Sequence, residues 1–444
     1  MKKLPFHIAL LFLCVSPIIA QDSLLFSNQT DDFPDSMLIV EKIFINGNDH
    51  TKGFVIEREM SLKPGSTITR QMLEYDKQRI YSLGLFNRVE MRVVPSTPPQ
   101  AMLFVELSER WFLFPYPIFG IRDRDWDRVY YGIGLLHNNF RGRNEKLAFS
   151  MIFGYDPSLA VYYRNPFLND EGSSFFESRI AFNKVHNKSL QGWIGSAGFS
   201  EKHFSVSVTV GKRFNIEHTL WATVSYEIVD ISDVLPVRTL SPDGKDKFPI
   251  VGVGYSYDTR DLVEYPGHGS MFRATITKFG IPSEDVDVVR YALDCRKYIP
   301  IVSNFVLTGR IFTDVAAAGK TPSYNRVYFG YSERIRGHFN EVIEGDRQIG
   351  TSAELHYPLF GPRYFKVDFL PREFGLWKFG IFAAVFADAG TVWFRGHPLA
   401  INNFKKGYGA GLHFLLPYGT IIRTEYAWNE IRHAEFILGF GTTF

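Results

Sequence analysis

The segment Phe204-Ser205-Val206-Ser207-Val208-Thr209-Val210-Gly211 alternates an apolar side chain with a small one along its whole length. Because successive side chains of a β-strand point to opposite faces, it predicts a strand with one lipid-like face and one polar face. The same alternation recurs in residues 147–153, 222–228, 251–257 and 272–276. No helical pattern of comparable length interrupts these segments, so residues 111–444 are predicted to form one β-domain.

Composition indicates how such strands are used. The 444 residues are 45% hydrophobic and 16% aromatic, with a mean hydropathy of −0.08 and a net charge of +2. This balance is too polar for a bundle of membrane helices, and the small net charge gives no field that would attract nucleic acid. Past the N-terminus no run approaches the ~20 apolar residues of a spanning helix. Any membrane crossing must then use strands closed into a barrel, which leaves no backbone group unpaired in lipid.

We therefore predict a mainly β protein with a transmembrane antiparallel barrel over residues 111–444. At about 20 residues per strand with its connection, this length fits about sixteen strands. A soluble sandwich or propeller would also alternate. Aromatic residues near the ends of the runs favour the barrel, because barrels carry aromatic girdles at both membrane interfaces. These residues are Tyr162, Tyr163, Tyr255, Tyr257, Trp377, Trp393 and Trp428.

The N-terminus is typical of an export signal. Lys2 and Lys3 precede an apolar run over residues 8–15, and Ala20 is a small residue at a plausible cleavage point. The alternatives are a buried helix or a membrane anchor, but the run is too short to span a bilayer. We expect a signal peptide over residues 1–20, a polar linker over 21–37, and Cys295 as the remaining cysteine, without an intramolecular disulfide.

Residues 38–110 are predicted to form a small α+β domain. A first strand stops at Asn46-Gly47-Asn48, a strong turn signal. Thr51 is expected to cap a short helix that contains Ile56 and Met60, and Thr69 a second helix that stops at Gly84. Two strands follow, over residues 86–94 and 102–107. The order is strand, helix, helix, strand, strand.

This domain resembles a polypeptide-transport-associated (POTRA) domain. The resemblance rests on Ile43-Phe44-Ile45-Asn46-Gly47-Asn48, the Leu83-Gly84-Leu85-Phe86 corner and Phe104-Val105-Glu106-Leu107-Ser108-Glu109, with Asn46, Gly47 and Gly84 at the turns. It implies a periplasmic module that binds extended client peptide by adding a strand to its sheet edge. The alternative is a small domain that serves only as a spacer.

The end of the chain carries a second resemblance. Phe436, Leu438, Phe440 and Phe444 share one face of the last predicted strand, and the chain ends on Phe444. This pattern resembles the signal by which bacterial outer-membrane barrels are recognised for insertion. The alternative is an ordinary edge strand that ends in phenylalanine.

Seven motifs follow one another along the barrel region: Asp258-Thr259-Arg260-Asp261, Pro266-Gly267-His268-Gly269, Ile335-Arg336-Gly337-His338, Gly350-Thr351-Ser352-Ala353-Glu354, Phe386-Ala387-Asp388-Ala389-Gly390, Gly407-Tyr408-Gly409-Ala410-Gly411 and Pro417-Tyr418-Gly419 with Arg423. In this order they resemble the BamA/TamA-type outer-membrane family, barrels with N-terminal POTRA domains that insert or translocate proteins. The arginine–glycine pair falls where that family has its long sixth extracellular loop. The family usually has an aromatic residue after this glycine, whereas His338 stands here.

Strand parity adds a physical expectation. In residues 349–357 and 379–387 the odd positions are the more apolar, so Glu354 and Asp388 are predicted to point into the lumen. If the loop folds back into the barrel, Arg336 can meet both carboxylates and, with Gly337, act as a loop latch.

The resemblance implies a bacterial outer-membrane protein whose POTRA-like domain lies in the periplasm and which inserts, assembles or translocates client proteins. A weakly closed seam between the first and last strands, with Phe436, Leu438, Phe440 and Phe444, would offer the client a template. A single POTRA-like unit favours a dedicated or accessory role. Expected partners are unfolded outer-membrane or exported clients, outer-membrane lipid and accessory periplasmic proteins, without nucleic acid.

Catalytic signals are few. The sequence contains neither a His-Glu-x-x-His pattern nor a Gly-x-Ser-x-Gly elbow. The glycines of residues 407–411 lack the helix that follows a nucleotide loop, which favours tight barrel packing. We expect no enzyme, no cofactor and no metal. Two alternatives stay open: a passive pore or lipid-handling barrel, and a barrel hydrolase that uses His356 or His413 beside Glu354 or Asp388.

Overall fold

The computed structural model describes residues 38–122, 125–168, 173–187, 189, 199–231, 234–235, 238–263, 265–282, 285–302, 304–331, 333–339, 341–370 and 375–441. The predicted signal peptide, the linker and Phe444 therefore lie outside the described residues. Where the chain is described, no helix combines the length and apolar character that a bilayer crossing needs.

The N-terminal domain has the predicted order of elements. It consists of β1 (Ile39–Asn46), α1 (Gly53–Glu57), α2 (Arg70–Ser82), β2 (Phe86–Pro95) and β3 (Gln100–Glu109). Its sheet has the order β1-β3-β2, with β1 parallel and β2 antiparallel to the central β3. Ile56, Ile80 and Leu103 are fully buried and join the helices to the sheet.

The turn residues of this domain have physical roles. Gly47 has φ +82°, and a Cβ there would lie 2.0 Å from the backbone oxygen of Leu107, so only glycine fits. It directly follows Asn46 at the end of β1, and Gly84, with φ +72°, follows α2. Thr69 caps α2 as predicted, because its side chain accepts a hydrogen bond from the amide of Met72 at 3.2 Å.

The prediction for α1 was wrong in two respects. The helix ends at Glu57, so Met60 lies beyond it, and its N-cap is Lys52, which makes no side-chain cap. The hydroxyl of Thr51 instead accepts a hydrogen bond from Nδ2 of Asn139 at 2.9 Å. A contact with a residue distant in sequence thus took the oxygen that a local cap would have used.

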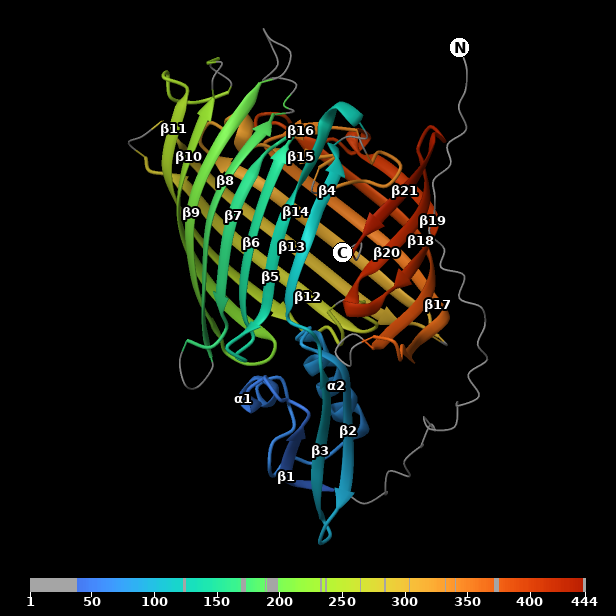
Figure 1. Ribbon diagram of the computed structural model, residues 1–444. Helices are drawn as coiled ribbons and strands as arrows, with labels where there is room; N and C mark the ends of the chain where they lie inside the picture. Colours follow the sequence, from blue (N-terminus) through green and yellow to red (C-terminus); the bar gives the residue numbers. More distant parts are fainter. Residues whose placement is uncertain are drawn as a thin grey trace. The chain divides into compact units, whose positions relative to one another are not determined.

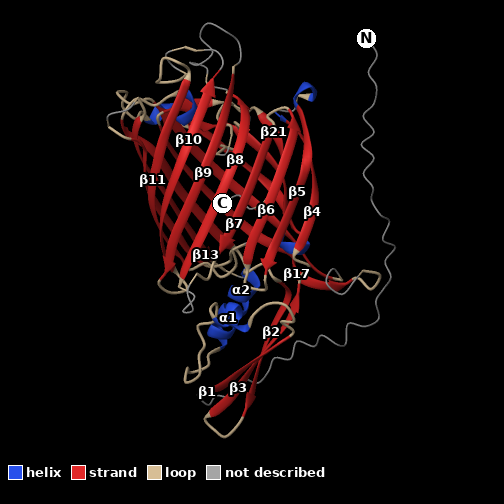
Figure 2. Ribbon diagram, turned by 60° about the vertical axis from the view of Figure 1, so that its left-hand side comes forward, coloured by secondary structure: helices blue, strands red, loops and turns tan. Residues whose placement is uncertain are grey.

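Sixteen antiparallel strands form the larger sheet, which Figure 1 shows curled into a barrel wall. They are β4 (Leu113–Ile121), β5 (Val129–Phe140), β6 (Glu145–Gly154), β7 (Ser158–Asn165), β8 (Ser174–His186), β9 (Ser200–Arg213), β10 (His218–Ile231), β11 (Lys245–Asp258), β12 (Gly269–Gly280), β13 (Asp287–Pro300), β14 (Val306–Ala318), β17 (Arg347–Lys366), β18 (Leu376–Trp393), β19 (Lys405–Leu415), β20 (Ile421–Asn429) and β21 (Ala434–Phe440). Figure 2 separates these strands from the short helices and the loops.

Side-chain parity in the sheet follows the sequence pattern. In β9, Phe204, Val206, Val208 and Val210 are exposed on the outer surface, while the residues between them are half-buried. Consecutive strands pair, except that β14 pairs with β17 across a long loop that contains β15 (Val327–Phe329) and β16 (Ile343–Gly345). The sheet is not closed: among the described residues, β4 pairs only with β5 and β21 only with β20.

Candidate functional site

The loop between β14 and β17, residues 319–346, packs against the inner wall of the barrel. Phe329 and Ile335 are buried with Phe312 of β14 and Val392 of β18 in one apolar cluster. Nearer the start of the loop, the Tyr324 hydroxyl donates to Asp246 of β11 at 2.6 Å. The loop is thus held by strands from separate parts of the barrel wall, β11 on one hand and β14 and β18 on the other.

Arg336 lies at the centre of a buried ionic network at the loop tip. Its side chain is 4% exposed. Its Nε and Nη2 donate to the two oxygens of Asp388 at 2.7 and 2.8 Å, a bidentate contact. Nη1 donates to Glu354 at 2.8 Å and to Glu425 at 3.0 Å, and Nη2 donates to the Ser352 hydroxyl at 3.1 Å. The structure therefore brings together Arg336, Glu354 and Asp388, and adds two partners.

Strand parity explains how three strands supply these groups. Glu354 of β17, Asp388 of β18 and Glu425 of β20 each occupy an inward position next to an outward neighbour. Phe386, two residues before Asp388, places its ring 3.5 Å from the Arg336 guanidinium. Glu425 was missed from the sequence, although outward-facing Tyr426 gave a parity signal that could have found it.

Two glycines allow the loop tip to approach the wall. Gly337 has φ +98°, and a Cβ there would lie 2.8 Å from the backbone oxygen of Trp428. At Gly407 of β19, a Cβ would lie 1.6 Å from the backbone oxygen of Arg336. Both positions exclude a side chain, which gives a packing reason for the glycines after Arg336 and at the start of the 407–411 motif.

The same loop tip is bonded to the last strand. The amides of Gly337 and Phe339 both donate to Oε1 of Glu435, at 2.8 and 2.9 Å. Phe339 also packs against a cluster that includes Ile437, the next inward residue of β21. Within the described part of the chain β21 pairs with β20 alone, so these contacts are a second support for it. No side-chain pattern marks Glu435 in the sequence, since its partners are backbone groups of a distant loop.

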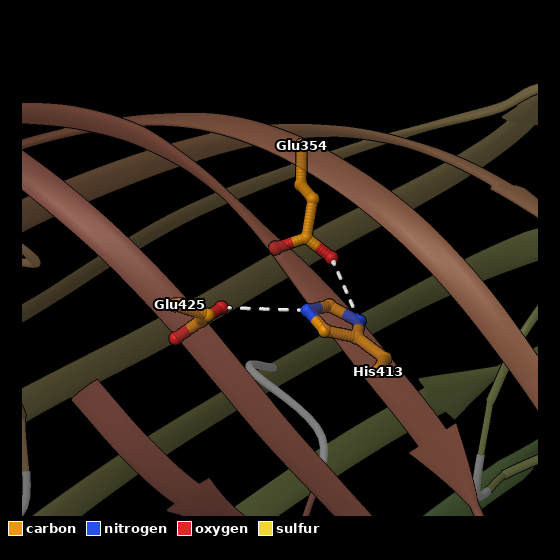
Figure 3. Close-up of side chains that lie close together, drawn as sticks. All are labelled: Glu354, His413 and Glu425. Atoms are coloured by element: carbon orange, nitrogen blue, oxygen red, sulfur yellow. Dashed lines mark hydrogen bonds and ion pairs between the residues drawn. The ribbon is translucent and has the colours of Figure 1, made fainter. Parts of the chain in front are cut away.

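Beside Arg336, a histidine lies between two of the carboxylates (Figure 3). Nε2 of His413 is 3.4 Å from Glu425 and Nδ1 is 3.9 Å from Glu354. These three residues offer ligand atoms within 4.8 Å of one another, a spacing that could hold a metal ion. However, the Arg336 guanidinium already engages both carboxylates and the Tyr265 hydroxyl lies 3.1 Å from Nδ1. The charge of Arg336 disfavours a divalent cation there.

The seam lies between β21 and β4. The hydrogen bonds that each of these strands makes with its neighbour show which of its backbone groups point toward the seam. The amide of Gly441 donates to the oxygen of Ile421 at 2.8 Å, so odd residues of β21 bond to β20. Leu438 and Phe440 therefore direct their N–H and C=O groups away from β20, to the outer edge of β21. Phe436 has the same parity, and the side chains of all three residues are exposed. Phe444, the fourth predicted seam residue, lies outside the described residues.

The opposite edge, β4, lacks some of its donors. The amide of Asn138 donates to the oxygen of Phe112 at 2.8 Å, so in the ladder with β5 the even positions of β4 face β5 and the odd positions face the free edge. Pro115 and Pro117 are odd, and proline has no N–H. Two of the five donors that this edge would otherwise carry are missing.

Comparison with known proteins identifies the family of this chain. Residues 139–444 match the model of the Omp85 superfamily domain. The chain belongs to the Omp85 superfamily. Residues 38–110 match the POTRA model described as surface antigen variable number repeat. This Omp85 protein is thus a bacterial outer-membrane β-barrel with a POTRA domain in the periplasm, related to the BamA/TamA type.

Individual relatives agree. The chain is 21% identical over 323 residues to outer membrane protein assembly factor BamA of Nitratidesulfovibrio vulgaris, covering 68% of this chain and 38% of that protein. It is 22% identical over 400 residues to the BamA of Neisseria meningitidis serogroup B, covering 81% and 47%. The Omp85 chain therefore spans less than half the length of the curated relatives it matches.

Solved structures share the fold. BamA from Haemophilus ducreyi lacking POTRA domains 1–3 matches with a TM-score of 0.53 at 18% identity, covering 91% of this chain and 83% of that one. CdiB from Escherichia coli matches with a TM-score of 0.60 at 12% identity, covering 91% and 75%.

His338 occupies the position where the BamA/TamA-type family usually has an aromatic residue. In this Omp85 chain it contacts two carboxylates. Its Nδ1 lies 2.5 Å from Glu341 of the loop, and its Nε2 lies 2.7 Å from Glu430 in the turn between β20 and β21. Burial would raise the pKa of both carboxyl groups, but the bonds to His338, with Lys405 beside Glu341, outweigh burial and lower each pKa. The histidine thus ties the loop to the turn that precedes β21.

These lowered pKa values predict an acid-sensitive contribution to stability. A carboxyl group with a depressed pKa stabilises the fold above its ordinary pKa of 4.5 and loses that contribution as pH falls through the lowered value. In His338→Phe the bonds are absent at every pH. We expect the wild-type urea midpoint to fall more between pH 7 and pH 3 than that of the variant. Other carboxylates titrate in both proteins and cancel, so equal falls would contradict the role given to His338.

Proposed function

We propose that this protein assists the insertion, assembly or translocation of client proteins at the outer membrane without acting as an enzyme. The proposal rests on the seam: among the described residues, β4 and β21 each have one strand neighbour in the larger sheet. An unpaired edge is a template for another strand. The POTRA domain, whose sheet has its own edges at β1 and β2, would receive the unfolded client before it reaches the seam.

The two edges of the seam are unequal, and this suggests how a client is handled. A client strand against β21 finds donors and acceptors at Leu438 and Phe440. Against β4 it finds acceptors without donors at Pro115 and Pro117. A net hydrogen bond contributes about 1 kcal/mol, so the loss of two donors weakens both client pairing at β4 and closure of β4 onto β21. In this proposal β21 is the templating edge.

Arg336 and Gly337 act in this proposal as a latch that keeps β21 in position while its outer edge is free. The latch holds the inner face through Glu435, whereas the client adds to the free edge of the same strand. The buried packing of the loop against the wall also argues against the alternative of a passive open pore, because apolar loop residues such as Phe329 occupy the inner side.

Purified protein in liposomes tests the proposal against its alternatives. The probe is a urea-unfolded eight-stranded outer-membrane barrel, whose folding is followed by the gel shift of folded barrels. Faster folding with the protein than with empty liposomes supports insertion. Ion conductance without faster folding would favour the passive pore, and ester or peptide hydrolysis would favour the barrel enzyme.

Restoring the donors of β4 should slow the reaction. In the double variant Pro115→Ala and Pro117→Ala, two N–H groups return to the free edge and can bond to β21. We expect tighter closure of the seam and slower client folding. Pro249→Ala is the matched control, since it restores one donor in β11, away from the seam. Unchanged client folding in the double variant would contradict the role of the donor-poor edge.

A further inference from the structure

The β17–β18 hairpin continues well past the barrel wall on the side of the POTRA domain. β17 last pairs with β14 at His356, opposite Val306, yet it runs on to Lys366. β18 last pairs with β19 at Gly380, yet it begins at Leu376. At about 3.3 Å per residue, β17 extends roughly 30 Å beyond its neighbour β14. In this stretch the two strands pair mainly with each other.

Two bulges bend the extension. The register of β17 shifts between Pro358 and Phe360 and again between Phe360 and Arg363, while β18 runs without an extra residue. A bulge inserts one unpaired residue and turns the strand that carries it. Figure 2 shows the end of β17 leaving the lower rim of the barrel sideways. The hairpin therefore bends away from the barrel just beyond the residues where β17 stops pairing with β14 and β18 stops pairing with β19.

One face of the hairpin is aromatic. Phe365 pairs with Trp377, so their side chains project from the same face, and Arg363 pairs with Phe379 on that face. The rings of Phe360, Phe365 and Phe379 contact one another, with centroids 6.1 to 6.5 Å apart. Phe365 and Trp377 are exposed nevertheless.

This face continues the lipid-facing surface of the barrel. β18 is unbroken, so Trp377 and Phe379 share the parity of Ile381, Ala383 and the exposed Val385 on the outer wall. The opposite face contacts the POTRA domain, where Lys378 Nζ lies 4.3 Å from the centre of the Tyr81 ring of α2.

We propose that the aromatic face of this hairpin, defined by Phe360, Phe365, Trp377 and Phe379, binds the periplasmic leaflet of the membrane. Its continuity with the lipid-facing row of β18 identifies lipid as the occupant. Phenylalanine, tryptophan and an arginine at the edge are the residue types that lie at the headgroup level. Phe369, at the turn and 85% exposed, adds apolar surface at the far end. The hairpin would then lie between the membrane surface and the POTRA domain.

Nitroxide accessibility tests this placement in the full-length protein in lipid nanodiscs. With Cys14→Ser and Cys295→Ser as background, a spin label is attached at Phe365→Cys on the aromatic face and at Lys366→Cys on the opposite face. Val385→Cys on the wall and Glu41→Cys on the POTRA domain are the lipid and water references. All four labelled positions are exposed, so we expect the cysteine variants to fold, and gel mobility checks that they do. Collisions with oxygen and with a water-soluble nickel complex are measured.

We expect the label at 365 to match the lipid reference, with a severalfold loss of nickel collisions relative to the label at 366. Equal nickel access at 365 and 366 would place the hairpin in water and overturn the proposal. Low access of both reagents at 365 would show a protein occupant instead and would also overturn it. Neither result depends on client folding, so this test is separate from that of the proposed function.

Discussion

Replacing Arg336 with alanine is expected to destabilise the barrel by about 3–5 kcal/mol, because removing one partner of a buried ion pair leaves the other charges uncompensated. Here three carboxylates, those of Glu354, Asp388 and Glu425, lose the same guanidinium. The loop should also become sensitive to added protease. Urea unfolding in lipid vesicles, followed by tryptophan fluorescence, gives the free-energy change.

Arg122→Ala is the matched control for this prediction. Its side chain is 51% exposed and its ion pair with Asp156 is long, at 3.7 Å, so we expect a loss below about 1 kcal/mol. Adding Asp388→Asn to Arg336→Ala should recover part of the stability, since one uncompensated charge disappears. If Arg336→Ala unfolded at the same urea concentration as Arg122→Ala, the buried network would not hold the loop.

Gly407→Ala is also expected to lower the free energy of unfolding strongly, although it changes no charge. The added Cβ would lie 1.6 Å from the backbone oxygen of Arg336, so the loop tip or β19 must move. Overpacking typically costs about 1–3 kcal/mol, and we expect about 3 kcal/mol here, because the backbone of β19 sets the Cβ position and the oxygen is itself a backbone atom. The displaced loop should again be cleaved by protease.

Gly309→Ala provides the comparison for that variant. Gly309 lies in β14, and a Cβ there would meet nothing within 4 Å. Alanine is no worse than glycine within a strand, so we expect no loss of stability. Equal stability to urea and equal protease cleavage of the Gly407→Ala and Gly309→Ala variants would show that the loop tip does not contact β19.

Local alternation predicted much of this molecule. It marked strands such as β9, β10 and β11 and the inward positions of Glu354 and Asp388, because side-chain direction in a strand depends only on parity. The length of residues 111–444 gave the number of strands. The family resemblance supplied the loop that brings Arg336 to them. Residues 38–110 followed the predicted order because their turns are marked by glycine and their second helix by a cap.

The remaining features depend on contacts between distant segments. Glu435 accepts hydrogen bonds from the loop backbone, which no side-chain pattern reveals. Thr51 was assigned to a local cap, but Asn139 took its hydroxyl. The β17–β18 extension is defined by where β14 and β19 end, so the sequence of the hairpin alone does not show that it leaves the wall. Trp377, predicted as part of an aromatic girdle, is one of the residues on that hairpin.

In the proposed function a client strand adds to the outer edge of β21. Photocrosslinking detects this contact: Phe436 is replaced with a photocrosslinking amino acid in the native host, and the cells are irradiated during a pulse of protein synthesis. Val224, an exposed outward residue of β10, is the control position. We expect adducts at 436 that contain newly synthesised outer-membrane or exported proteins and that disappear during the chase. Adducts equal at 436 and 224, or none at 436, would contradict it.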